Sequence, residues 1–131
     1  MALKDAGILA ADVDYINAHA TSTSIGDESE LKAMFRVFGE RKDLHISATK
    51  SMTGHLLGAA GAIEAIICVK AIQDGIVPPT INTTDVDGDW KNKFNLTLGV
   101  AQHKSIEYAM SNTFGFGGHI ATALFRKFNV S

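Results

Sequence analysis

A loop near the middle of the 131-residue chain combines the residue types that acid–base and anion-stabilising chemistry requires. Lys50 and His55 lie five positions apart in a stretch rich in hydroxyl groups and glycine, just before an apolar segment. A second histidine, His19, is followed by several threonines and serines. A cation and an imidazole near a helix N-terminus are suited to receive a negatively charged or polarised group. We therefore interpret this loop as part of a chemical site.

The hydrophobic pattern predicts an α/β fold that brings these loops together. We expect two short strands at residues 15–18 and 45–48 and two helices at residues 27–38 and 56–74. A C-terminal hairpin should pair residues 106–112 with residues 120–128. This order predicts a mixed β-sheet with flanking helices in one domain, residues 1–131. Ligands of such sheets lie beyond the carboxyl ends of the strands, so His19, Lys50 and His55 should converge there.

Local signals predict how the helices begin and what covers them. Asp27, with Glu30 three positions later, forms an acidic capping box that should begin the first helix. The segment 56–74 is apolar nearly all round, which predicts a buried helix in which Glu64 is an isolated carboxylate. The polar residues 80–95 are expected to form a solvated connection.

Composition and spacing exclude several classes of site. A net charge of −2 gives no electrostatic footprint for nucleic acid or an anionic membrane, so neither is expected as a partner. The single cysteine, Cys68, fits a reducing compartment and lies in the apolar helix, where it should pack rather than react. The histidine spacing does not fit zinc, so no metal and no cofactor is predicted. The chain therefore offers acid–base groups but no nucleophile.

Three stretches resemble the elongating β-ketoacyl-acyl carrier protein synthases, in the order and spacing of that family: Asn17–Thr23, Lys50–Gly61 and Ser111–Gly118. The resemblance implies a thiolase-like fold of two similar halves that works as a homodimer. It identifies the chain as the C-terminal half without its first strand. The nucleophilic cysteine would then belong to the missing N-terminal half, since Cys68 does not match it.

The resemblance also assigns roles to four residues around the loop. His19 and His55 would donate hydrogen bonds to the malonyl thioester oxygen during decarboxylation. Lys50 and Glu64 would support His55, although a structural salt bridge is the alternative for Glu64. The parent enzyme would condense an acyl thioester with malonyl-acyl carrier protein in fatty acid elongation, whereas the isolated chain should be inactive.

Further residues would contact the substrates in a protein that resembles this family. Thr21 and Thr23 would bind the phosphopantetheine arm of the acyl carrier protein, which is the expected partner beside the missing half. Phe114 and Phe116 would gate the acyl pocket, or else pack within the hairpin. Ile120 stands where an asparagine is usual in the family.

Two alternatives remain open at this point: a fragment of a polyketide-type ketosynthase, and a non-catalytic piece that only binds a partner. The compartment expected from the resemblance is the bacterial cytoplasm or the matrix of a mitochondrion or plastid.

Overall fold

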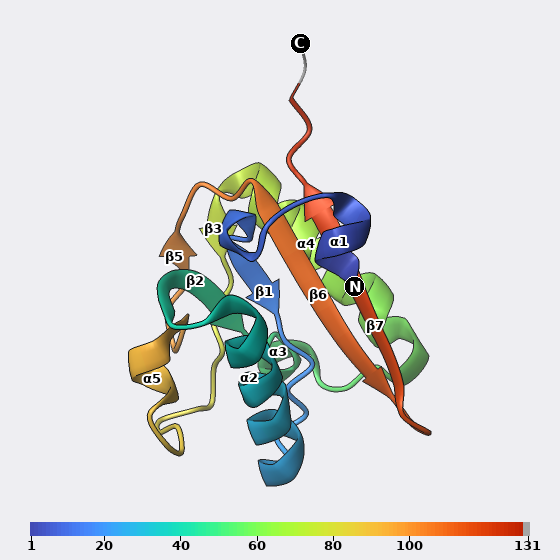
Figure 1. Cartoon of the computed structure of the whole chain (residues 1–131). Coiled ribbons are helices and arrows are strands. Elements are labelled where there is room, and N and C mark those ends of the chain that lie inside the picture. The colour runs from blue at the N-terminus through green and yellow to red at the C-terminus, as the bar shows by residue number, and fades with distance from the viewer. Residues whose placement is uncertain (130–131) are drawn as a thin grey trace.

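A five-stranded mixed β-sheet organises the chain in the computed structural model, which describes residues 1–129 (Figure 1). Its strands are β1 (Tyr15–Asn17), β2 (Arg41–Ser47), β4 (Phe94–Leu96), β6 (Tyr108–Gly115) and β7 (His119–Arg126). The order across the sheet is β4-β2-β1-β6-β7. The first four run parallel, and β7 pairs antiparallel with β6. The predicted mixed α/β fold with its terminal hairpin is confirmed.

The remaining elements connect and cover these strands. A separate small sheet pairs β3 (Ile76–Val77) with β5 (Gln102–His103). The helices are α1 (Ala2–Ala6), α2 (Ser24–Phe38), α3 (Lys50–Thr53), α4 (Ala60–Asp74) and α5 (Trp90–Lys93), with 3-10 turns at Ala10–Asp12 and Leu57–Ala59. The segment predicted as a solvated connection, residues 80–95, therefore contains α5 and the start of β4. Among residues 1–129, no helix has both the length and the apolar character needed to cross a bilayer.

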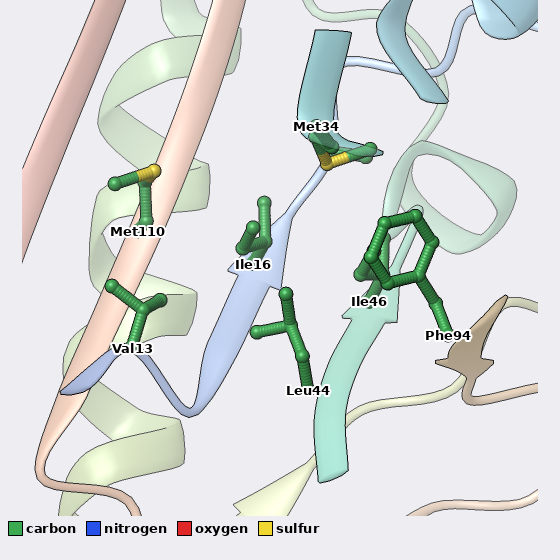
Figure 2. Close-up of a cluster of buried hydrophobic side chains, with 8 residues drawn as sticks. Val13, Ile16, Met34, Leu44, Ile46, Phe94 and Met110 are labelled. Carbon is green, nitrogen blue, oxygen red and sulfur yellow. The ribbon is translucent and has the colours of Figure 1, made fainter. Parts of the chain in front are cut away.

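The two long helices lie on opposite faces of the sheet, and successive residues of β1 point to opposite cores (Figure 1). Ile16 packs on the α2 side with Met34, Leu44 and Phe94, in the cluster that Figure 2 shows. Tyr15 packs on the α4 side with Cys68, Ala71 and Ile72. This sheet, held from both faces, supplies the strand ends on which the predicted site residues lie.

The start of α2 differs from the prediction of an Asp27 cap. The N-cap is Thr23, and Asp27 N donates a hydrogen bond to Thr23 O at 2.9 Å, so Asp27 already belongs to the helix. A Cβ at Gly26 would collide with Thr23 Oγ1, so any larger residue there would require the Thr23 side chain to rotate. Glu30 does not close a capping box. Its carboxylate binds backbone groups outside the helix.

The prediction that the helix over 56–74 is buried all round is wrong for this chain. α4 begins at Ala60, and its buried side carries Glu64, Cys68 and Ala71. Its opposite side is apolar but uncovered: Ile63, Ile66 and Val69 are 36%, 59% and 39% exposed. The sequence indicated correctly that both sides are apolar. Among residues 1–129, nothing covers this second side fully.

Candidate active site

The two predicted histidines lie next to each other at the carboxyl ends of neighbouring strands. His19 follows β1, and His55 follows the short helix α3, which comes directly after β2. Their ring centroids are 5.5 Å apart and the rings are nearly perpendicular, at 89°. The ring of Phe114, from β6, lies 5.3 Å from that of His19. The convergence expected from the sheet topology is therefore present.

A backbone hydrogen bond sets the tautomer of His55. Leu57 N donates to His55 Nδ1 at 3.1 Å, and a nitrogen that accepts a hydrogen bond carries no proton. In this geometry the neutral ring carries its proton on Nε2, so His55 can donate a hydrogen bond from that atom. Leu57 has a φ of 51°, in the left-handed region that costs a non-glycine residue about 1–2 kcal/mol.

His19 is buried and held in its neutral form. Burial lowers its pKa from 6.5 to about 4, and the positive charge of Lys50 and the neighbouring His55 act in the same direction. A protonated ring here would lose its hydration and face an adjacent cation. The imidazole of His19 is therefore neutral at physiological pH.

Lys50 and Glu64 form a buried ion pair that joins α3 to α4. The side chains are only 5% and 2% exposed, and Lys50 Nζ donates to Glu64 Oε1. A buried carboxylate or ammonium is unfavourable alone, so each charge depends on the other. Beneath the pair, Asn17 Nδ2 donates to Thr49 Oγ1 at 2.8 Å and so ties the end of β1 to the start of the α3 turn.

Glu30 is a site residue that the sequence analysis misassigned. Its buried carboxylate accepts hydrogen bonds from His19 N at 3.0 Å and Ala20 N at 2.9 Å, and a third from Asn112 Nδ2 at 3.3 Å. Burial raises the pKa of Glu30, and these donors oppose that rise. The informative signal was its position four residues before Met34, because this places a carboxylate on the buried face of α2.

A groove of about 660 Å³ opens beside the imidazole pair. It is lined by Lys50 and His55, by the first turns of α2 and by residues of the segment 80–88, and His19 is not among its lining residues. Thr21 lines this groove. Thr23 does not line it and is instead the N-cap of α2.

The two phenylalanines predicted to share a loop lie in different environments. Phe114 is the residue before last of β6 and pairs with Ile120, so it belongs to the strand rather than to a loop. Phe116 lies in the turn between β6 and β7 and is 91% exposed. The structure therefore brings only Phe114 to the histidines.

Cys68 is unsuited to nucleophilic chemistry. It is fully buried, its Sγ donates to Met110 O at 3.7 Å, and burial together with the charge of Glu64 raises the pKa of its thiol to about 12. Within residues 1–129, no three histidine, cysteine, aspartate or glutamate side chains are grouped so that they could hold a metal ion.

A family model for the C-terminal domain of beta-ketoacyl synthases matches residues 1–84, which include both histidines, Lys50 and Glu64. The chain belongs to the β-ketoacyl synthase family. The 3-oxoacyl-[acyl-carrier-protein] synthase 2 of Staphylococcus aureus (strain COL) is 51% identical over 128 residues, which are 97% of this chain and 30% of that protein. The enzyme of the same name from Vibrio harveyi is 48% identical over 128 residues and is also matched over 30% of its length.

Solved structures of ketosynthases have the same fold. A beta-ketoacyl synthase from Burkholderia phymatum STM815 superimposes with a TM-score of 0.89 at 41% identity, over 97% of this chain and 30% of that one. The structure of a type II PKS acyl-carrier protein in complex with its ketosynthase, bound to the hexaketide, superimposes with a TM-score of 0.91 at 35% identity. The match covers 98% of this chain and 31% of that one. The chain thus spans under a third of the length of these relatives, and its fold is that of thiolase-like ketosynthases.

Removal of the buried cation should destabilise this chain strongly. Lys50→Met leaves Glu64 charged without a partner, so we expect the free energy of unfolding to fall by about 3–5 kcal/mol in urea denaturation. Lys50→Met combined with Glu64→Leu should cost less, because no buried charge remains. Lys70→Met is the matched control: Lys70 pairs with Asp74 on the surface of α4, and its loss should cost less than about 1 kcal/mol. Equal costs for the two lysines would contradict a buried pair.

The lowered pKa of His19 predicts a pH dependence of stability. The unfolded chain binds a proton at His19 near pH 6.5, and the folded chain only near pH 4. Between these values the unfolded state holds more protons, so the contribution of His19 to the free energy of unfolding falls as pH falls. His45 contributes in the same direction, so the measurement is the difference in slope between the wild type and His19→Gln. An NMR titration of the His19 ring with a midpoint near 6.5 would be inconsistent with this account.

Proposed function

We propose that the chain is the C-terminal part of a 3-oxoacyl-[acyl-carrier-protein] synthase. In this enzyme it would supply the two histidines that promote decarboxylation of malonyl-acyl carrier protein. The observation that carries the proposal is the His55 tautomer, since an Nε2–H donor locked by Leu57 lies beside a neutral His19. The roughly 50% identity to the named synthases over nearly the whole chain supports the same assignment.

Two neutral donors are suited to the charge that forms in decarboxylation. The bond between the malonyl α-carbon and its carboxylate breaks, carbon dioxide leaves, and the electron pair delocalises onto the thioester oxygen as an enolate. Hydrogen bonds from His19 and His55 to that oxygen would stabilise the developing charge, as preorganised donors do in oxyanion holes. The α-carbon then attacks the acyl thioester on the enzyme's cysteine. A carbon–carbon bond forms and the cysteine thiolate leaves.

The surrounding residues would support this step and hold the substrate. The Lys50–Glu64 pair would keep α3, and with it His55, in place against α4. Thr21 lines the groove and is proposed to bind the phosphopantetheine arm, with Thr23 next to it on the same loop. Phe114 contacts His19 and is proposed to border the acyl pocket, whereas the exposed Phe116 would contact it from the turn.

The thiol that carries the acyl group would come from outside these 131 residues. Cys68 is too deeply buried to serve, and the uncovered apolar side of α4 offers a surface on which a second half of the synthase would pack. A homodimer and an acyl carrier protein as substrate carrier complete the proposal. The acyl carrier protein is named with a related ketosynthase in a solved complex. The bacterial sources of the relatives favour a bacterial cytoplasm over an organelle matrix.

A polyketide ketosynthase is the second candidate. The type II PKS ketosynthase complex has a TM-score of 0.91, so the fold does not separate the two pathways. The sequence favours fatty acid elongation, with 51% identity to the synthase of Staphylococcus aureus against 35% to that ketosynthase. Mass spectrometry of the products formed from malonyl-acyl carrier protein separates a single ketoacyl extension from a polyketide.

Loss of either histidine should abolish decarboxylation in the synthase that contains this chain. We expect His19→Ala and His55→Ala to lower the release of carbon dioxide from malonyl-acyl carrier protein by about 10²–10³-fold, the effect of removing one oxyanion donor. His103→Ala is the matched control, because His103 is exposed in β5. Wild-type decarboxylation by both site variants would refute the proposed roles. The 131-residue chain alone should not elongate an acyl thioester.

The apolar side of α4 should bind a hydrophobic reporter dye in the isolated chain. Ile66→Lys places a charge at the centre of this surface and should reduce the fluorescence of the dye without altering the fold, since Ile66 is 59% exposed. In the synthase, the same variant should weaken the packing of the two halves, as measured by thermal denaturation. A folded synthase of unchanged stability would argue against a partner on this surface and favour a different arrangement of the enzyme.

A further inference from the structure

The helix α3 carries two site groups but is too short to hold its own position. It has four residues, and a single helical turn is unstable without outside contacts. Lys50 is its first residue, and His55 follows its last residue by two positions. Whatever holds α3 from outside therefore determines where both groups lie. The ion pair to Glu64 holds it from the α4 side.

Residues 80–82, which we call the brace, are hydrogen-bonded to α3 at Ser51. Ile81 N donates to Ser51 Oγ at 3.0 Å, and Asn82 Nδ2 donates to Ser51 O at 3.2 Å. The same Ser51 hydroxyl donates to Ala48 O at 2.7 Å, which closes the turn at the end of β2. Both hydrogen bonds from the brace to α3 are therefore made to Ser51.

Asn82 acts as a cap for α3 supplied from 31 positions along the chain. Carbonyl groups in the last turn of a helix lack helical partners, and among residues 1–129 no backbone N–H group is bonded to Ser51 O. The side-chain amide of Asn82 fills this role. The φ of Asn82 is 60°, a left-handed conformation that asparagine tolerates better than other residues with a side chain.

The brace is anchored firmly at its other end. Thr80 N donates to Thr97 O, and Gly99 N donates to Thr80 O, each at 2.8 Å. Thr80 Oγ1 also accepts a hydrogen bond from Ala48 N at 2.8 Å. These bonds join the brace to the segment after β4, so it transmits the position of the sheet to α3.

We propose that Ser51 and Asn82 are positioning residues for decarboxylation. Through the brace they hold α3 so that Lys50 meets Glu64 and the Nε2–H group of His55 lies beside His19. This inference rests on the proposed function of the two histidines. Misplacement of a donor weakens its bond to the enolate oxygen more than it weakens substrate binding, so kcat should change more than KM.

The test compares three variants of the complete synthase. Asn82→Gly keeps the left-handed backbone and removes the amide donor. Ser51→Ala removes the hydroxyl group, and Ser51→Thr restores it. Asn92→Ala is the matched control, because Asn92 is an exposed asparagine of α5 whose side chain donates to Asp89. The measurements are kcat and KM for decarboxylation of malonyl-acyl carrier protein, the melting temperature, and the NMR shifts of the His55 ring nitrogens.

We expect Asn82→Gly and Ser51→Ala to lower kcat about tenfold, the effect of losing one hydrogen bond, with KM nearly unchanged and shifted His55 nitrogen signals. Ser51→Thr and Asn92→Ala should match the wild type. If Ser51→Ala does not fold, Asn82→Gly decides, because Asn82 is exposed. Wild-type kcat and unchanged His55 signals would overturn this inference. If His19→Ala and His55→Ala also decarboxylate normally, the proposed function fails as well.

Discussion

The buried ion pair between Lys50 and Glu64 is the interaction on which the site depends. Neither charge is stable in the interior alone, since the desolvation of one ion costs several kcal/mol. α3 must therefore lie where Lys50 reaches the inner side of α4, and His55 follows from the end of α3. The same cation lies close enough to help lower the pKa of His19. The pair thus fixes the position of α3, and its cation adds to the burial that lowers the pKa of His19.

Two different features of the structure prepare the two rings. His19 is kept neutral by burial and by the cation, whereas the proton of His55 is directed to Nε2 by the backbone of Leu57. Hydrogen-bond donors without net charge suit a reaction whose substrate is anionic and whose product is neutral carbon dioxide. A charged donor would bind the malonyl carboxylate as well as the enolate, and uniform binding of both states does not accelerate the step.

Much of the site could be predicted because its residues obey rules that act through topology. Parallel neighbouring strands bring their carboxyl ends together, so His19 and His55 converge although they lie 36 positions apart in sequence. Glu64 was identifiable as an isolated charge on an apolar helix. Glu30 was misassigned because its spacing from Asp27 imitates a capping box, and local spacing cannot show that N–H groups after β1 compete for that carboxylate. Phe114 was misplaced because glycines obscured the end of β6.

The brace and the outer side of α4 were beyond the reach of sequence patterns for a different reason. A polar segment such as 80–82 has the same composition whether it is solvated or bonded to a distant turn, so periodicity carries no signal. The second apolar side of α4 was visible in the sequence, but whether residues cover it is not a local property. Ile63 and Glu64 are adjacent on this helix, and Ile63 is exposed whereas Glu64 is buried. Any protein surface that covers Ile63 therefore also fixes the helix on which the ion pair is built.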